Sequence, residues 1–333
     1  MPTAVAIPLF VASLGATLAA AAYFARTLDR LGVRVGLPEA LLGLLTAVAA
    51  DAPEITSAIV ALFKGAGGVS LGVVVGSNVF NLAAMIGLTA ILAGGIRLRR
   101  ESLGVEGTVG LLVTLIATLV VLDALPAGAA VGLVALVLAP YLALLARGPA
   151  IARHLPFSER IDRGLARALG EREHWGHHEK VGEEAVWKLV AIMIPAVALI
   201  VLGSTGMVES AITLSDRWNV SQSIVGVLVL APLTSIPNAF TAGRLGLAGR
   251  GSALVSETLN SNTINLVAGL VVPALFVSVV SLTTQTKFDL AWLLLMTVTS
   301  LAVLAPARGC GRAGGAGLIV LYCVFAVVAV AAG

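Results

Sequence analysis

The sequence predicts an all-α polytopic membrane protein, with ten transmembrane helices arranged as two inverted five-helix repeats. Three observations predict this fold class. Hydrophobic residues make up 58% of the 333 residues, charged residues make up 12%, and the mean hydropathy is +1.01. Lysine and arginine fall almost entirely in alternate loops, and the chain matches itself at a fixed offset. Because a soluble domain has about 25% charged residues, the composition excludes that class.

Apolar stretches near the ~20 residues needed to cross a bilayer recur along the whole chain. A membrane β-barrel would instead show alternating segments of about ten residues. The N-terminal stretch lacks the basic region of a cleaved signal peptide, so we interpret it as a retained first span. We expect spans at residues 4–24, 37–63, 69–93, 104–122, 127–146, 187–208, 221–245, 252–280, 288–305 and 315–332.

The basic residues set the expected orientation. Loops that follow odd-numbered spans hold 18 of the 21 lysines and arginines, and the other loops hold Lys64, Arg217 and Lys287. The positive-inside rule then places both termini outside and residues 147–188 in the cytoplasm. Arginine far outnumbers lysine, which is typical of a GC-rich bacterial genome, so we expect a multi-pass protein of a prokaryotic inner (plasma) membrane. The expected units are a first five-helix repeat (1–146), a cytoplasmic linker (147–186) and a second, inverted repeat (187–333).

The chain matches itself without a gap at a fixed offset of 184, which pairs Pro53 with Pro237 and which we call the repeat offset. Identities between alanines or leucines are common by chance in membrane spans, but identities in proline, glycine, serine and asparagine are not. The two copies lie in spans 2–3 and 7–8, and a separation of five spans turns the second copy upside down. The informative pairs are Pro53/Pro237, Gly65/Gly249, Gly67/Gly251, Ser77/Ser261, Asn78/Asn262 and Asn81/Asn265.

A proline interrupts the same span in both copies. Pro53 and Pro237 fall in mid-span, and Pro232 is an additional one. Proline removes a backbone donor and frees carbonyl groups one turn back, which is tolerated at this depth where the helix faces protein or a wet cavity. Corresponding interrupted spans in two halves indicate a transporter binding site near the midplane.

Carboxylates within the spans are the next signal. A charge at the bilayer centre costs about 2.5–3.5 kcal/mol on insertion scales. We count three deep carboxylates, Asp51, Glu54 and Glu257, and find no lysine or arginine deep in any span to pair with them. A mobile cation or a proton is therefore the expected partner.

Helical spacing predicts that further oxygen-bearing side chains converge with these carboxylates. Asp51 and Glu54 are three residues apart, and Glu257, Ser261 and Asn265 form one row four residues apart. Carboxylates, amide carbonyls and hydroxyls suit hard cations such as Ca²⁺, whereas soft metals would need Cys, Met or His. The remaining candidate ligands are Ser77, Asn78, Asn81, Thr234, Ser235, Asn238 and Asn262.

Polar residues in spans also hydrogen-bond neighbouring helices, and this purely structural alternative stays open for Ser57, Ser70 and Thr241.

The segments 53-PE-54, 76-GSNVFN-81 and 234-TSIP-237 resemble the α-repeats of the sodium/calcium exchanger (cation/Ca²⁺ antiporter) superfamily. The resemblance covers the two repeats closely and the ten-span layout loosely. It implies a ten-helix antiporter core that holds a cation between two inverted halves. Glu54 then corresponds to the first-repeat cation-binding glutamate, and Ser77 and Asn78 to the serine and asparagine of the second motif.

The motifs also depart from the family pattern. Asn238 stands where the second repeat usually has its glutamate, Asp51 replaces a hydroxyl residue, and Glu257 stands where the second repeat usually has asparagine. We therefore expect Asp51, Glu54 and Glu257 to surround one cation, with Asn238 as a neutral ligand. Close carboxylates oppose each other's ionisation, so one of them is expected to hold a proton.

The function expected from these residues is secondary active antiport of Na⁺ (or H⁺) against Ca²⁺ by alternating access. By the resemblance, spans 1 and 6 would rock against the core. We expect no resident cofactor and no enzymatic activity, with inorganic cations and the bilayer as partners. Three alternatives stay open: an antiporter for a different cation, a cation-binding or sensing protein of this fold that does not exchange ions, and an intramembrane enzyme, although no nucleophile motif or histidine within the spans supports the last.

The 147–188 segment contains all four histidines. Residues 158–171 have an amphipathic pattern that predicts a helix along the membrane surface. His174 and His178 are four residues apart, which allows a regulatory metal site, although a solvated linker is the commoner explanation. Cys310 and Cys323 form no disulfide framework, because there are only two of them, and we expect both to be buried small apolar residues.

Overall fold

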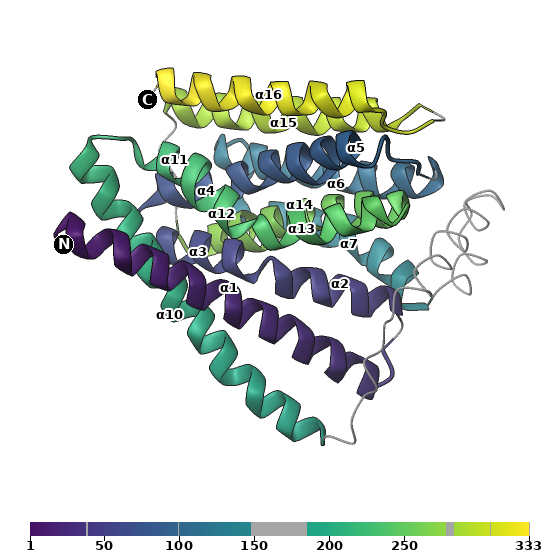
Figure 1. Ribbon diagram of the computed structural model, residues 1–333, viewed down its shortest axis with the longest axis horizontal. Coiled ribbons are helices and arrows are strands. Elements are labelled where there is room, and N and C mark those ends of the chain that lie inside the picture. The colour runs from purple at the N-terminus through teal and green to yellow at the C-terminus, as the bar shows by residue number, and fades with distance from the viewer. Residues whose placement is uncertain (38, 99, 148–184, 278–282, 307, 333) are drawn as a thin grey trace.

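The computed structural model describes residues 1–37, 39–98, 100–147, 185–277, 283–306 and 308–332. Apart from one isolated bridge between Ile96 and Cys310, all regular structure in these residues is helical, as predicted (Figure 1). Six of the described helices are long and apolar enough to cross a membrane, or eight if each of two bent pairs counts as one span. The all-helical membrane class is thus confirmed, and the count of ten spans stays a prediction.

Two long helices pack along each other at one side of the molecule (Figure 1). They are α1 (Thr3–Arg34) and α10 (Val186–Trp218). Gly203 and Gly206 of α10 lie so close to α1 that an added Cβ would collide with Thr17 or Ser13. Both helices run about ten residues beyond the predicted spans, because helical hydrogen bonding continues through polar ends where hydropathy falls.

The centre of the fold contains two interrupted spans. One consists of α2 (Glu39–Ala50) and α3 (Ala52–Phe63), bent by 53° at Asp51. The other consists of α11 (Gln222–Val225), η3 (Gly226–Leu230) and α12 (Ala231–Thr234), followed after a 49° bend by α13 (Ile236–Leu247). Pro53 and Pro237 lie directly after the two breaks, so the predicted interruptions are confirmed.

Each interrupted span is followed by a buried helix. After α3 come α4 (Gly67–Asn81), η1 (Leu82–Leu88) and α5 (Thr89–Leu92). After α13 come α14 (Gly251–Leu266), η4 (Val267–Val271) and η5 (Pro273–Leu275). The predicted span 252–280 is therefore not one regular helix, because it changes to π geometry at Val267 and to a short 3₁₀ helix that begins at Pro273.

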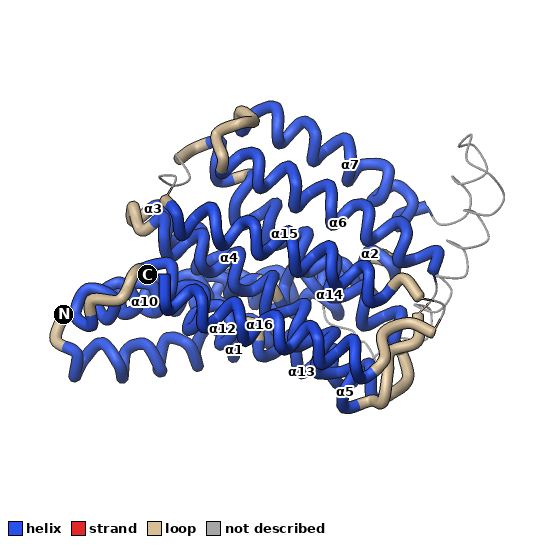
Figure 2. Tube along the Cα trace, turned by 90° about the horizontal axis from the view of Figure 1, so that it is seen from above, coloured by secondary structure: helices blue, strands red, loops and turns tan. Residues whose placement is uncertain are grey.

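Four helices complete the fold: α6 (Arg100–Val121), α7 (Ala127–Arg147), α15 (Thr284–Leu304) and α16 (Arg312–Ala332) (Figure 2). Helix α15 begins before the predicted span 288–305, because the Thr283 hydroxyl accepts a hydrogen bond from the Thr286 amide at 3.1 Å and caps it. The helix boundaries follow the same repeat offset as the sequence. Both ends of α3 map onto the ends of α13, and the start of α6 maps onto the start of α15.

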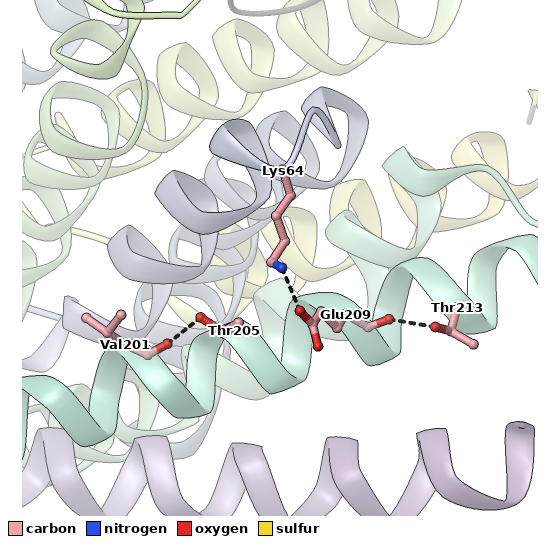
Figure 3. Close-up of polar contacts among 5 residues, drawn as sticks. All are labelled: Lys64, Val201, Thr205, Glu209 and Thr213. Carbon is pink, nitrogen blue, oxygen red and sulfur yellow. Dashed lines mark hydrogen bonds and ion pairs between the residues drawn. The ribbon is translucent and has the colours of Figure 1, made fainter. Parts of the chain in front are cut away.

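An ion pair joins the end of α3 to the long helix α10 (Figure 3). Lys64 Nζ lies 2.6 Å from Glu209 Oε1, and the two side chains are 34% and 51% exposed. Both cysteines are free. Cys310 is buried as predicted, whereas Cys323 is exposed, so the prediction of burial was wrong for Cys323 because its face of α16 is not packed against other described helices. The predictions for residues 158–171, His174 and His178 fall outside the described residues.

Candidate cation-binding site

The two helix breaks present the same backbone position to the middle of the protein. Asp51 caps α3 with φ −80° and ψ −3°, and Ser235 caps α13 with φ −84° and ψ −3°. Both side chains are completely buried. Each cap is followed by a proline in the first helical turn, where its missing amide removes no helical hydrogen bond. The sequence thus ends one helix and starts the next while directing a polar side chain inward from each break.

The two breaks bond to each other across the repeats. Asn238 Nδ2 donates to Asp51 Oδ1 at 2.6 Å and lies 3.4 Å from Glu54 Oε1. Ser235 Oγ donates to Glu54 Oε1 at 3.0 Å. At the repeat offset, Asp51 corresponds to Ser235 and Glu54 to Asn238. The contacts are therefore reciprocal, because each cap residue bonds to the residue three positions after the cap in the other copy, which is the pattern of a two-fold interface.

Helices α4 and α14 close the site from the other side. Ser261 Oγ of α14 donates to Asp51 Oδ1 at 2.7 Å. Asn81 Nδ2 of α4 lies 3.3 Å from Ser261 Oγ and 3.1 Å from Asn262 Oδ1, and Asn262 Nδ2 donates to the Asn78 carbonyl at 3.0 Å. All of these side chains are less than a tenth exposed. Residues far apart in the sequence thus form one buried polar centre.

Each central carboxylate has one bonded and one unbonded oxygen. Asp51 Oδ2 and Glu54 Oε2 are buried without a hydrogen-bond partner among the described residues, and no described lysine or arginine forms an ion pair with either side chain. An unpaired buried charge is strongly unfavourable, so we expect a cation or a proton to bind at these oxygens. Further buried oxygens without a partner in the described residues are Ser57 Oγ, Asn78 Oδ1, Asn81 Oδ1, Asn265 Oδ1 and Glu257 Oε2. Carboxylate, amide and hydroxyl oxygens in this number form the donor set of a hard cation.

Some predicted ligands point elsewhere in this conformation. Ser77 Oγ donates to the Val74 carbonyl at 3.1 Å, and Thr234 Oγ1 bonds to the Leu230 carbonyl at 2.9 Å, so both hydroxyls bond back into their own helices. Asn265 makes no hydrogen bond through its side chain to a described residue.

The expected cage of three carboxylates is not formed among the described residues, where no group of three or more Asp, Glu, His or Cys side chains gathers as a metal site. Glu257 lies within electrostatic range of Asp51 but forms no hydrogen bond with it. The reason is the helical row on α14, which directs Ser261 at Asp51 and leaves Glu257 one turn away. The centre therefore holds Asp51, Glu54 and Asn238, with Glu257 beside it.

Sequence reasoning did not single out two further buried carboxylates, which lie near span ends and are not among the three counted deep in the spans. Glu106 of α6 is 8% exposed and accepts a hydrogen bond from Ser256, and Asp289 of α15 is completely buried. Both lie near the ends of predicted spans (104–122 and 288–305). An acidic residue inside a predicted span was the sequence signal that could have identified them. Tyr141 Oη also donates to Asn260 Oδ1 at 2.8 Å, which joins α7 to α14.

Glycines bring α4 against the second interrupted span. A Cβ at Gly76 would lie 2.7 Å from Val227 Cα and 2.8 Å from Ala231 Cβ, and one at Gly72 would lie 2.7 Å from the Ser223 carbonyl oxygen. This close approach is typical of small residues in packed membrane helices. It holds α4 beside the helix that leads to Ser235 and Asn238.

Comparison with known proteins identifies relatives of this architecture. The family model described as "Sodium/calcium exchanger protein" matches residues 5–146 and 188–331. The sodium/calcium exchanger MaX1 of Methanosarcina acetivorans is 35% identical over 72 residues, which is 21% of each chain. The putative antiporter CaxA of Alkalimonas amylolytica is 25% identical over 225 residues, covering 67% of this chain and 66% of that protein. The alignments thus span less than two thirds of the length of these two relatives.

Solved structures share the fold over almost the whole chain. A crystal structure of the H⁺/Ca²⁺ exchanger CAX superposes with a TM-score of 0.68 at 13% identity, covering 98% of this chain and 86% of that one. The sodium-calcium exchanger NCX_Mj superposes with a TM-score of 0.58 at 18% identity, covering 97% and 98%. At such identities the likeness establishes the fold alone.

Proposed function

Because this chain belongs to the sodium/calcium exchanger protein family, we propose that it is a secondary active antiporter that exchanges Na⁺ or H⁺ for Ca²⁺. Its multi-pass helical architecture agrees with transport across a membrane. The names of the relatives include an antiporter, a sodium/calcium exchanger and an H⁺/Ca²⁺ exchanger, which support cation/Ca²⁺ antiport in general. The identity of the two ions is our proposal.

One observation carries the proposal. Asp51 and Glu54 of one repeat meet Asn238 and Ser235 of the other in a buried centre, and each carboxylate keeps one oxygen without a described partner. The two carboxylates supply two negative charges, which one divalent cation or two monovalent charges would neutralise. Because both kinds of ion would use the same oxygens, binding of one excludes the other, and this competition is the basis of exchange.

The architecture we propose is ten spans in two inverted halves, divided into residues 1–146 and 187–333 with a cytoplasmic linker between them. The uniform repeat offset and the reciprocal contacts of the two breaks support this arrangement. The distribution of basic residues supports outside termini in a prokaryotic plasma membrane. The proposed ligands are Asp51, Glu54, Asn238, Ser235 and Ser261 in the centre, with Ser77, Asn78, Asn81, Thr234, Glu257, Asn262 and Asn265 around it.

Movement of the α1–α10 pair against the core would alternate access to this site. The two helices pack mainly on each other. They contact the core chiefly through α2 and α3, beside the break that carries Asp51 and Glu54, and less through the second interrupted span. A sliding contact of this kind would open one side of the centre while the other closes.

Flux through the purified protein in proteoliposomes tests the proposal. Vesicles loaded with Na⁺ and diluted into Na⁺-free buffer should take up tracer Ca²⁺ in proportion to the gradient, and Glu54→Gln should abolish this uptake. A pH gradient in place of the Na⁺ gradient identifies H⁺ as the counter-ion. Ca²⁺ binding by calorimetry without any counterflow would contradict antiport and favour a sensor, and uptake of another cation with no Ca²⁺ uptake would contradict the proposed ion.

A further inference from the structure

A buried acidic site lies outside the central one, between α15 and α11. Asp289 is completely buried, and each of its oxygens accepts one hydrogen bond from a neutral donor. Ser223 Oγ donates to Oδ2 at 2.8 Å, and Gln285 Nε2 donates to Oδ1 at 2.8 Å. No described lysine or arginine forms an ion pair with this carboxylate. Two neutral hydrogen bonds do not compensate a full charge removed from water.

Around this carboxylate lie aromatic side chains and one acceptor oxygen that makes no hydrogen bond. Gln285 Oε1 is buried with no hydrogen-bond partner among the described residues, although it belongs to the amide that faces Asp289. Phe288 and Trp292, on either side of Asp289 along α15, pack with each other at a ring separation of 5.4 Å and with Phe325 of α16 at 5.8 and 5.9 Å. An acceptor oxygen next to a buried carboxylate is itself a sign of a missing positive charge.

The elements that pack on α15 bring no described charged group to Asp289. Helices α4, α11 and η1 contain no titratable residue, and Lys287 of α15 has an exposed side chain. Glu106 of α6 bonds to Ser256, and Arg312 of α16 bonds to the Ile91 carbonyl, each near the first turns of its helix. Tyr322 of α16 packs its ring on Phe80 and is a neutral group at physiological pH. The charge to be balanced is therefore a single negative one.

The site is distinct from the central one. Twelve residues separate Ser223 from Ser235, which corresponds to about 18 Å along a helix. Helix α11 lies at the end of the molecule where the chain terminates, which the predicted topology places outside (Figure 1). Helix α11 packs on α4 and continues into the interrupted span. Through its hydrogen bond with Ser223, Asp289 therefore contacts the helix that leads to Asn238.

We propose that Asp289, Ser223 and Gln285 form a second cation site, which holds one positive charge, either Na⁺ or H⁺. The carboxylate supplies the charge, and the serine hydroxyl and glutamine carbonyl supply neutral oxygens. A proton would sit on Asp289 itself, and the resulting O–H group would donate a hydrogen bond to the Gln285 carbonyl oxygen after rotation of the amide.

The test uses the full chain with the central carboxylates neutralised, so that it does not depend on exchange. In the Asp51→Asn/Glu54→Gln background, two signals are measured on the purified protein: retention of tracer Na⁺, and the infrared carbonyl band of protonated carboxyls. Adding Asp289→Asn should abolish Na⁺ retention or remove one component of the infrared band, to which buried carboxyls such as Glu257 also contribute, whereas adding Asp216→Asn, an exposed carboxylate of α10, should change neither signal. Loss of Na⁺ retention identifies a sodium site, and loss of an infrared component identifies a proton site.

Two unchanged signals in a folded Asp289→Asn protein would overturn the proposal and leave Asp289 with a structural role. If that variant does not fold, Ser223→Ala tests the site instead, because it keeps the charge of Asp289 and removes the hydroxyl oxygen of Ser223. It should weaken Na⁺ retention or shift the infrared band, and an unchanged signal would again overturn the site.

Discussion

The two interrupted spans have nearly the same backbone and different chemistry. They bend by 53° and 49° at corresponding positions of the two repeats, yet one presents Asp51 and Glu54 and the other presents Ser235 and Asn238. The first repeat thus supplies the charge and the second supplies hydrogen-bond donors. Repetition of the fold does not require repetition of the charge, because an amide and a hydroxyl in the second copy can donate to carboxylates of the first.

The neighbouring helices differ in the same way. Gly72 and Gly76 let α4 approach the second interrupted span, whereas their counterparts at the repeat offset, Ser256 and Asn260, bond to Glu106 and Tyr141. The second repeat therefore uses hydrogen bonds where the first uses close backbone packing.

The largest effect is expected from removing the charge of the first repeat. Glu54→Gln or Asp51→Asn leaves the shape of the site and removes half of its charge, so Ca²⁺ uptake should fall about 100-fold or more, equivalent to about 3 kcal/mol. Asp216→Asn provides the exposed control and should transport normally. Uptake in Glu54→Gln above half of the wild-type rate would contradict the assignment of this carboxylate.

Giving the second interrupted span a carboxylate should increase the dependence of stability on Ca²⁺. Asn238→Asp removes the donor shared by Asp51 and Glu54 and adds a third acid, so the ion-free protein should lose about 3 kcal/mol of stability. Ca²⁺ should restore more stability to this variant than to wild type, and thermal melting with and without Ca²⁺ measures both. Asn238→Ala controls for the lost hydrogen bonds, and an equal response of the two variants to Ca²⁺ would show that the added charge does not face the ion.

Filling the close contact of the first repeat should have a smaller effect. Gly76→Ala places a methyl group against Val227 and Ala231, and overpacking of this kind costs about 1–3 kcal/mol. Gly104→Ala on α6 is the matched control, since nothing lies within 4 Å of its added Cβ. Thermal melting of both variants measures this cost, and Gly76→Ala should melt at the lower temperature. Equal melting temperatures would mean that α4 relaxes away from the interrupted span.

The smallest effect is expected at the ion pair between α3 and α10 (Figure 3). Lys64→Ala should cost less than about 1 kcal/mol, because exposed ion pairs contribute about 0.2–1 kcal/mol. The charge exchange Lys64→Glu/Glu209→Lys should recover the stability lost in either single variant. Failure of the double variant to recover would indicate that the pair contributes nothing measurable to the contact of α10 with α3.

Much of the site could be predicted from the spacing of particular residues. The prolines at 53 and 237 predicted both breaks, and the matched serines and asparagines of the two copies predicted which helices meet. The position of Glu257 could not be predicted, because helical spacing places it on the same row as Ser261 without saying which of the two reaches Asp51. Asp289 and Glu106 were missed for a related reason: hydropathy does not distinguish the buried face of a span from its exposed face.

The sequence by itself determined the membrane class, the repeat and its offset, the two interruptions and the identity of the charged residues, because composition and local backbone preferences act within a few residues of each position. Only the tertiary structure decided which oxygens face each other, such as Asn238 on both Asp51 and Glu54, and which carboxylates are removed from water, such as Asp289. Those outcomes depend on the angles at which helices cross and on glycine contacts between segments far apart in the chain, and a linear pattern does not contain them.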